Sequence, residues 1–357
     1  MRGDQMRIKL TVVLLVALLL IVGYGPGDVS AQLLMNGAGA TFPYPLYSKW
    51  FDEYDKIDRS VRFNYQSIGS GGGIRQIMAR TVDFGASDGP MTDEQLSRAP
   101  GELFHIPMVM GAVVATYNLP GSPSLRFTPD LLADIFLGNV TRWNHPRIEA
   151  ANPEVPLPNQ PIIVVHRSDG SGTTYIWVDY LSKVSQEWAQ KVGRGTSVNW
   201  PVGLGGKGNE GVAGQVKNTP SALGYVELAY AITNKLPVAA IRNRAGNFVQ
   251  PSIESTTAAA AGAAKEMPPD FRVSLTDPQG EDAYPVAGFT WLLVYKEQPD
   301  EVRGKALVRF LWWAIHDGQR YAPSLLYAPL PAQVVKMVEA KIKQITYQGK
   351  PLLPAHR

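Results

Sequence analysis

The 357-residue chain is predicted to fold as an α/β protein of two lobes, each a β-sheet flanked by helices, with a ligand cleft between them. Apolar runs with strand character alternate along the chain with segments of helical periodicity, which is typical of α/β architecture. Two apolar segments, near residues 104–109 and 284–290, are suited to cross between the lobes as a two-segment hinge. The length exceeds one typical domain and suits two.

The first 31 residues are predicted to be a cleaved signal peptide. Three basic residues lie among the first nine, and a continuous apolar stretch follows over residues 10–22. Small residues at the −3 and −1 positions place cleavage after Ala31. An uncleaved membrane anchor is the alternative interpretation, but this apolar stretch is short for a span that needs about 20 residues.

Composition narrows the class of protein. Apolar residues make up 45% of the chain and charged residues 18%, as in ordinary globular proteins. The formal net charge of +3 gives no electrostatic basis for nucleic-acid binding. The chain has no cysteine, which excludes disulfides, thiol catalysis and a lipid-modified cysteine anchor. An exported chain of this kind is expected in the periplasm of a Gram-negative cell.

The expected elements follow in chain order. The first lobe opens with three strand-like segments, and a polar turn and then a helix are expected after the first two of them. An alanine-rich segment late in the second lobe is expected to be a solvated surface helix or loop. The strands are expected at 33–35, 61–66, 82–88, 104–118, 162–165, 222–226 and 285–294, the helices near 44–54, from 74, and at 131–137, 175–192, 256–265, 301–318 and 332–345, and the irregular segments at 143–161 and 203–214.

The clearest polar motif is residues 167–173, Arg-Ser-Asp-Gly-Ser-Gly-Thr, between a predicted strand and a predicted helix. Helix N-termini carry free backbone N–H groups and the positive end of the dipole, so they attract anions. The glycines let the backbone approach a ligand, while Ser171 and Thr173 add hydroxyl donors. This turn is predicted to hold a small oxyanion.

Two further turns repeat this chemistry, at residues 40–42 and 69–71. A single such turn is equally well explained by helix capping, because serine and threonine are good N-caps. Three of them, on both lobes, favour one shared ligand. Arg167 is the evident positive charge, and its forked guanidinium can bind an oxyanion through two parallel bonds. An ion pair with Asp169 is the alternative, and both can hold if Asp169 fixes the guanidinium plane.

Asp88 ends the third predicted strand and is expected to face the same ligand. An ionised carboxylate only accepts hydrogen bonds, so it accepts a proton from mono- or dibasic phosphate and repels sulfate. An anion without that proton leaves the buried carboxylate unpaired, so its affinity for the site is much lower. The alternative is a plain N-cap for a helix that begins near Thr92.

The other motifs are weak. Residues 203–208 match a dinucleotide fingerprint, but no clear strand precedes them, and residues 201–208 lack two required positions of a phosphate-binding loop. The five histidines show no metal-ligand spacing. Neither a cofactor nor a metal is therefore expected. His166 as the base for Ser171 is the enzyme hypothesis, although no nucleophile-elbow pattern surrounds that serine.

Six blocks in order along the chain resemble the periplasmic phosphate-binding proteins of high-affinity phosphate ABC importers. Together they span essentially the whole predicted mature chain, and the combination is very specific. The blocks are GAGATFP at 37–43, VDFGASD at 82–88, RSDGSGT at 167–173, WPVGLGGKGN at 200–209, GYVE at 224–227 and GEDAYP at 280–285.

The resemblance implies a type II periplasmic binding protein, with lobe I at 32–106 and 286–357 and lobe II at 107–285. It implies that Asp88 accepts the phosphate proton and that Asp169 pairs with Arg167. The remaining phosphate-binding residues that it implies are Ala40, Thr41, Phe42, Ser70, Ser171, Gly172 and Thr173.

The expected function is capture of inorganic phosphate by hinge closure and delivery to the permease subunits of an ABC importer. The protein is expected to be a monomer without catalytic activity. Three alternatives stay open: a secreted phosphate-ester hydrolase that uses Ser171 or Ser70, a binding protein for sulfate or molybdate, and a signalling or adhesive role.

Cleavage after Ala31 predicts an exported protein that begins at Gln32. N-terminal sequencing or intact mass of the periplasmic protein checks this prediction. Retention of residues 1–31 in the membrane fraction would instead support the uncleaved anchor.

Overall fold

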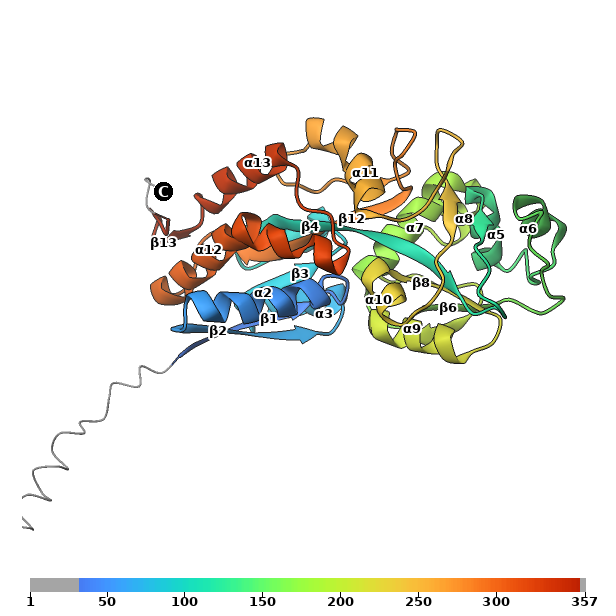
Figure 1. Ribbon diagram of the computed structural model, residues 1–357. Coiled ribbons are helices and arrows are strands. Elements are labelled where there is room, and N and C mark those ends of the chain that lie inside the picture. Colours follow the sequence, from blue (N-terminus) through green and yellow to red (C-terminus); the bar gives the residue numbers. More distant parts are fainter. Residues whose placement is uncertain (1–31, 354–357) are drawn as a thin grey trace, which may run out of the picture.

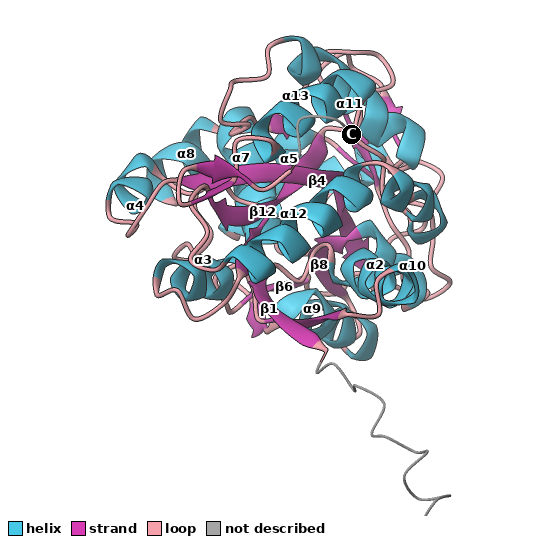
Figure 2. Ribbon diagram, turned by 90° about the vertical axis from the view of Figure 1, so that its left-hand side faces the viewer, coloured by secondary structure: helices cyan, strands magenta, loops and turns pink. Residues whose placement is uncertain are grey.

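The computed structural model describes residues 32–353, so the predicted signal peptide lies outside the described residues. Two groups of strands and helices lie side by side and are joined by β4 (Leu103–Tyr117) and β12 (Val286–Tyr295) (Figure 1). Viewed onto the first-lobe end, the strands are flanked by helices (Figure 2). None of the helices between residues 32 and 353 is long and apolar enough to span a membrane.

The remaining elements alternate as the sequence predicts. The strands are β1 (Leu33–Gly39), β2 (Val61–Ser67), β3 (Phe84–Ser87), β5 (Arg126–Phe127), β6 (Ile163–Arg167), β7 (Leu204–Gly206), β8 (Ala222–Glu227), β9 (Ala240–Arg242), β10 (Phe248–Val249), β11 (Leu275–Thr276), β13 (Thr346–Tyr347) and β14 (Lys350–Pro351). The helices are α2 (Tyr44–Ile57), α3 (Ser70–Met78), α4 (Asp93–Ser97), α5 (Pro129–Leu137), α6 (Pro146–Ala151), α7 (Gly172–Val184), α8 (Gln186–Lys191), α9 (Gly208–Asn218), α10 (Leu228–Thr233), α11 (Ile253–Lys265), α12 (Glu301–Ile315), η1 (Asp317–Tyr321), η2 (Pro323–Leu325) and α13 (Ala332–Ile342).

One sheet runs through both lobes in the order β2-β1-β3-β12-β4-β8-β6-β7, with β11 paired to β12. The first part of β4 pairs antiparallel with β12, and its last five residues pair with β8. All residues of β4 and β12 are buried, which explains their continuous apolar sequences. The α/β class and the two crossing segments are confirmed. The lobe boundaries at 106/107 and 285/286 remain predictions, and the first falls within β4.

The C-terminal helices return to the first lobe, as the crossing segments predict. The Trp50 indole on α2 donates to the carbonyl of Gly318 over 2.7 Å. On α12, the Arg303 guanidinium bonds both carboxylate oxygens of Asp83 and the carbonyl of Leu34. These contacts tie α12 and the segment after it to α2, β1 and the residue before β3.

Helix α3 begins at Ser70, four residues earlier than predicted, because its glycines serve helix–sheet packing rather than a turn. A Cβ on Gly73 would lie 2.6 Å from the carbonyl oxygen of Ala38 and 2.7 Å from that of Ala86. Only glycine therefore lets α3 approach β1 and β3 this closely. The first turn of α3 consequently reaches the end of the sheet where the polar turns gather.

Two other expectations are corrected. Residues 203–214 form β7 and the start of α9 instead of a glycine loop, because α9 buries Val212, Ala213 and Val216 against the sheet. The alanine-rich α11 is the expected surface helix, but only one of its faces is solvated. Its buried face, which contacts β4, β11 and β12, consists of Ser255, Thr256, Ala259, Ala260 and Ala264.

Candidate anion-binding site

The turn at residues 167–173 joins the end of β6 to the first turn of α7. Ser171 is the N-cap of α7, and its Oγ accepts from the amide of Thr174 over 3.0 Å. The Ser171 amide donates to the carbonyl of Thr196. The Thr173 amide has no hydrogen-bond partner between residues 32 and 353. As a cap, Ser171 Oγ accepts one bond and keeps its hydroxyl hydrogen undonated within the described residues. The Thr173 amide is a second free donor at the positive end of the helix dipole.

The turn at residues 40–42 presents two further free amides. The Ala40 amide donates to the carbonyl of Ala86 over 3.0 Å, so Ala40, which was expected to bind the ligand, has no donor to offer. The amides of Thr41 and Phe42 have no partner in the described part of the chain.

Three tyrosine hydroxyls hold this turn by its carbonyls. The carbonyls of Ala40, Thr41 and Phe42 each accept one, at 2.7, 2.5 and 2.6 Å; the donors are Tyr65, Tyr230 and Tyr327. A carbonyl and the amide that follows it share one peptide plane and point in opposite directions. Fixing the first two carbonyls therefore fixes the amides of Thr41 and Phe42.

Ser70 brings the turns of both lobes together. Its Oγ accepts from the amide of Asp88 over 3.2 Å and from the amide of Gly172 over 2.9 Å. Beside it, the Gly71 amide donates to the carbonyl of Gly170 over 2.9 Å. The Ser70 amide, in the first turn of α3, has no partner among residues 32–353. The predicted turns therefore meet at one place.

Asp88 lies in the middle of these donors and is 1% exposed. Its Oδ1 accepts from the Thr290 hydroxyl over 2.8 Å, and its Oδ2 has no partner in the described chain. Burial raises the pKa of Asp88 to about 7, although Thr290, Arg167 and Ser70 act in the opposite direction. The capping alternative is wrong, because Thr92 is the N-cap of α4.

Two local features allow Asp88 to sit there. A Cβ on Gly172 would lie 2.6 Å from Asp88 Oδ2, so only glycine permits the N-terminus of α7 to come this close. Thr290 stands at a register shift between β12 and β4, opposite the stretch that contains Pro107. Proline lacks an N–H, so it favours such an irregularity in a ladder.

Arg167 and Asp169 form the predicted ion pair. Arg167 Nε and Nη2 bond the two carboxylate oxygens of Asp169 at 2.8 and 2.5 Å. The Gly208 amide also donates to Asp169, over 3.0 Å. Burial works against these bonds, yet they leave the pKa of Asp169 below its usual value. The guanidinium is buried with its plane fixed, and its Nη1 lies 3.5 Å from the hydroxyl oxygen of Thr173.

No histidine is placed as a base for either candidate nucleophile in the described residues. Ser171 Oγ and Ser70 Oγ accept from backbone amides, and no histidine bonds either hydroxyl in residues 32–353. His166 stacks on Trp200 and its Nδ1 lies 3.0 Å from the carbonyl of Arg167. Within the same residues no group of acidic or histidine side chains could hold a metal.

Sequence reasoning missed several residues around the site. Thr290, Tyr230 and Tyr327 come from segments distant in the chain, so no local pattern marked them. Glu227 is fully buried; its Oε2 accepts from the Ala229 amide and lies 3.2 Å from the hydroxyl oxygen of Tyr327. Burial raises the pKa of Glu227 well above its usual value. Only Asn209 had a signal, as the polar residue that ends a glycine-rich run before a helix.

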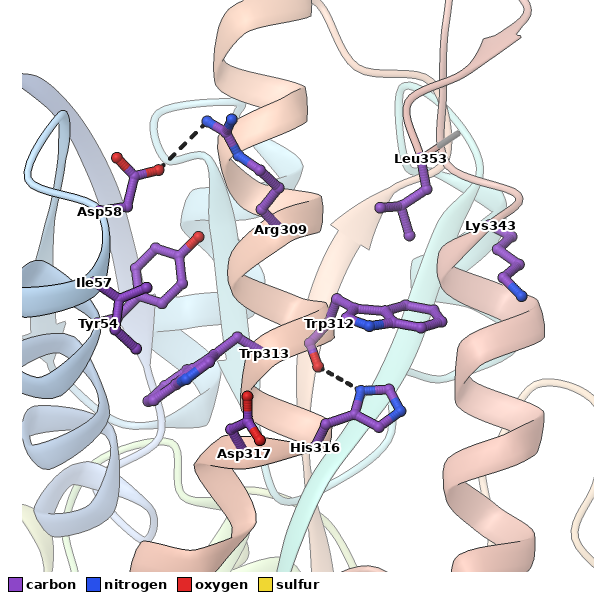
Figure 3. A pocket seen from close by; sticks show the side chains of 10 residues that line it. All are labelled: Tyr54, Ile57, Asp58, Arg309, Trp312, Trp313, His316, Asp317, Lys343 and Leu353. Carbon is purple, nitrogen blue, oxygen red and sulfur yellow. Dashed lines mark hydrogen bonds and ion pairs between the residues drawn. The ribbon is translucent and has the colours of Figure 1, made fainter. Parts of the chain in front are cut away.

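A separate hollow between α2, α12 and α13 has a different character (Figure 3). Some of its polar side chains are already paired, whereas the Trp313 indole N–H has no partner in the described chain. Arg309 lies 3.5 Å from Asp58, and His316 contacts the Trp312 carbonyl and Glu339. The unpartnered amides of Thr41, Phe42, Ser70 and Thr173 lie around Asp88 and not in this hollow, so the candidate anion site is the one at Asp88.

Known proteins resemble this chain along most of its length. The PBP superfamily domain model matches residues 26–317. The phosphate-binding protein PstS of Xylella fastidiosa is 49% identical over 317 residues, which cover 88% of this chain and 86% of that protein. The chain belongs to the PstS family. Its relatives include the archaeal PstS of Methanocaldococcus jannaschii, 40% identical over 86% of this chain and 85% of that one.

Solved structures agree with the PstS fold. A high-affinity periplasmic phosphate-binding protein, PfluDING, bound with phosphate, has a TM-score of 0.70 at 22% identity and covers 86% of this chain and 93% of its own. A phosphate-binding protein from Stenotrophomonas maltophilia has a TM-score of 0.65 at 19% identity, with 87% and 94% covered. The two-lobed fold of type II periplasmic binding proteins is therefore established for this chain.

The Asp88 carboxyl predicts a pH-dependent stability in phosphate-free protein. Its folded pKa of about 7 lies above the ordinary value of 3.8. The free energy of unfolding therefore falls as the pH rises past the ordinary pKa of the carboxyl and through about 7. The loss is roughly 3 kcal/mol between pH 4.5 and pH 8. Urea unfolding at both pH values should show that Asp88→Asn removes this loss.

The exposed Asp282 provides the matched control. Asp282→Asn should leave the pH dependence of the free energy of unfolding as in the wild type. Parallel pH profiles for wild type and Asp88→Asn would show that Asp88 is not buried as a costly charge.

Proposed function

We propose that this protein binds inorganic phosphate in the periplasm and delivers it to the permease subunits of an ABC importer. Its PstS relatives are named phosphate-binding proteins, and a similar structure holds phosphate. The predicted signal peptide supports export to the periplasm. The protein acts as a monomeric carrier without catalytic activity.

The observation that carries this proposal is the unpartnered Oδ2 of Asp88 among unpartnered donors. Amide donors and a guanidinium suit any small oxyanion. An ionised carboxylate in the same place suits only an oxyanion that brings its own proton, because a carboxylate can only accept. Monobasic and dibasic phosphate carry that proton at neutral pH, whereas sulfate does not. Asp88 thus selects phosphate, and Arg167 with the amides binds its other oxygens.

Binding is coupled to closure of the two lobes. Contacts between residues of the predicted lobes I and II surround the site, including Ser70 with Gly172 and Gly71 with Gly170. Hydrogen bonds to an anion are stronger in a closed, dry site than in water, so phosphate stabilises the closed arrangement. The shared strands β4 and β12 serve as the two hinge segments.

Calorimetry with phosphate and sulfate, beside a phosphatase assay, tests the function. Stoichiometric phosphate binding at micromolar Kd or tighter, weak sulfate binding and no turnover are expected, because a few charged hydrogen bonds of about 1.5–3 kcal/mol each suffice. Repeated turnover of a phosphate ester would refute the carrier function. Equal affinities for the two anions would refute the selective role of Asp88.

The preference for phosphate over sulfate is expected to depend on pH. Above about pH 7 Asp88 is ionised and repels sulfate, and below it the protonated carboxyl becomes a donor that sulfate can accept. Sulfate affinity should therefore rise roughly tenfold from pH 8 to pH 5, in step with the protonated fraction of Asp88. In Asp88→Asn the sulfate affinity should be nearly independent of pH. A wild-type sulfate affinity that does not change with pH would contradict this mechanism.

A further inference from the structure

Asn209, in the first turn of α9, is fully buried and bridges the two lobes. Its Nδ2 donates to Thr41 Oγ1 over 2.8 Å and to Thr173 Oγ1 over 3.0 Å. Its backbone amide donates a second bond to Thr41 Oγ1, over 3.2 Å. Its Oδ1 accepts from the amide of Glu227 over 2.9 Å, which fixes the side-chain amide with its NH₂ toward the threonines.

These bonds decide the direction of two hydroxyl hydrogens. A threonine hydroxyl has two lone pairs and one hydrogen. Both lone pairs of Thr41 Oγ1 are taken by Asn209, so its hydrogen must be donated elsewhere. Thr173 Oγ1 accepts from Asn209 and lies 3.5 Å from Arg167 Nη1. Neither hydroxyl donates to any group between residues 32 and 353, although both are buried.

We propose that Asn209 is a positioning residue for phosphate, which forces the hydroxyls of Thr41 and Thr173 to act as donors to the bound anion. This inference rests on the proposed phosphate-binding function. The Asn209 side chain can donate to a hydroxyl but offers it no acceptor, since its one acceptor atom, Oδ1, faces the Glu227 amide. A hydroxyl that accepts from Asn209 is therefore oriented before the anion arrives, and little orientational freedom is lost on binding.

The same geometry couples hydroxyl orientation to closure. Thr41 follows β1 in the first lobe, whereas Thr173 and Asn209 begin two helices of the second. Separation of the lobes breaks the two bonds from Asn209 to Thr41 and leaves its one bond to Thr173 in place. Asn209 consequently acts on Thr41 only in the closed state and on Thr173 in both.

That asymmetry provides the test. Phosphate Kd is measured by calorimetry for Asn209→Ala in four backgrounds: wild type, Thr41→Val, Thr173→Val, and both valine substitutions together. In the wild-type background the Kd should rise roughly tenfold, since a charged hydrogen bond is worth about that factor or more. In each single-valine background, Asn209→Ala should still raise the phosphate Kd, but by a smaller factor. In the double-valine background, where both hydroxyls are absent, Asn209→Ala should leave the Kd unchanged.

Other patterns overturn the inference. If Asn209 is only a latch between the lobes, its effect disappears in Thr41→Val alone, because that substitution already cuts its contact with the first lobe. If Asn209→Ala merely damages the fold, the Kd rises by the same factor in all four backgrounds. No change in the wild-type background also refutes the positioning role.

Controls distinguish a failure of the Asn209 role from a failure of the proposed phosphate binding. Asn218 lies exposed on the same helix and bonds only the Gly214 carbonyl, so Asn218→Ala should leave Kd unchanged. Should Asn209→Ala not fold, as thermal unfolding would reveal, Asn209→Ser is measured in the same four backgrounds. A wild-type protein that does not bind phosphate refutes the function as well, whereas normal wild-type binding with the wrong pattern refutes only the role of Asn209.

Discussion

A buried carboxylate facing an anion site is the constraint on which the rest of this structure depends. Asp88 is 1% exposed, and one of its oxygens has no partner in the described chain. A buried charge without a partner is costly, and the raised pKa of Asp88 expresses that cost. The site is consistent with a ligand that is both an anion for the amides and a proton donor for the acid.

The fold places the acid there through contacts from distant segments. Asp88 directly follows the C-terminal end of the central strand β3, and Thr290, beside an irregularity in the β12–β4 pairing, donates to it. The N-terminus of α7 approaches because Gly172 has no side chain. Tyrosine hydroxyls hold the carbonyls of the facing turn so that its amides stay free. The tyrosine contacts keep the amides of Thr41 and Phe42 unpaired, whereas Thr290 and Gly172 determine where Asp88 lies.

The sequence predicted those parts of the site that depend on local chemistry. Residues 167–173, Ser70 and Asp88 stand where strands end and helices begin, so polarity and glycine content identified them. Thr290 acts through a pairing across a long stretch of chain, and such a pairing leaves no local pattern. The sequence marks the position of Asn209, at the end of a glycine-rich run, but not its contacts with Thr41 and Thr173. The start of α3 was misplaced for a related reason, since the glycine content of its first turn is set by the sheet against which it packs.

A crystal structure of the phosphate complex at about pH 8 tests the central claim most directly. If Asp88 accepts the phosphate proton, a phosphate oxygen lies about 2.5–2.7 Å from Asp88 Oδ2, the length of a charge-assisted O–H···O bond. The amides of Thr41, Phe42, Ser70 and Thr173 should then lie around the other oxygens. An anion held by the amides and Arg167 with Asp88 turned away, or separated from it by water, would contradict the claim that this acid selects the ligand by its proton.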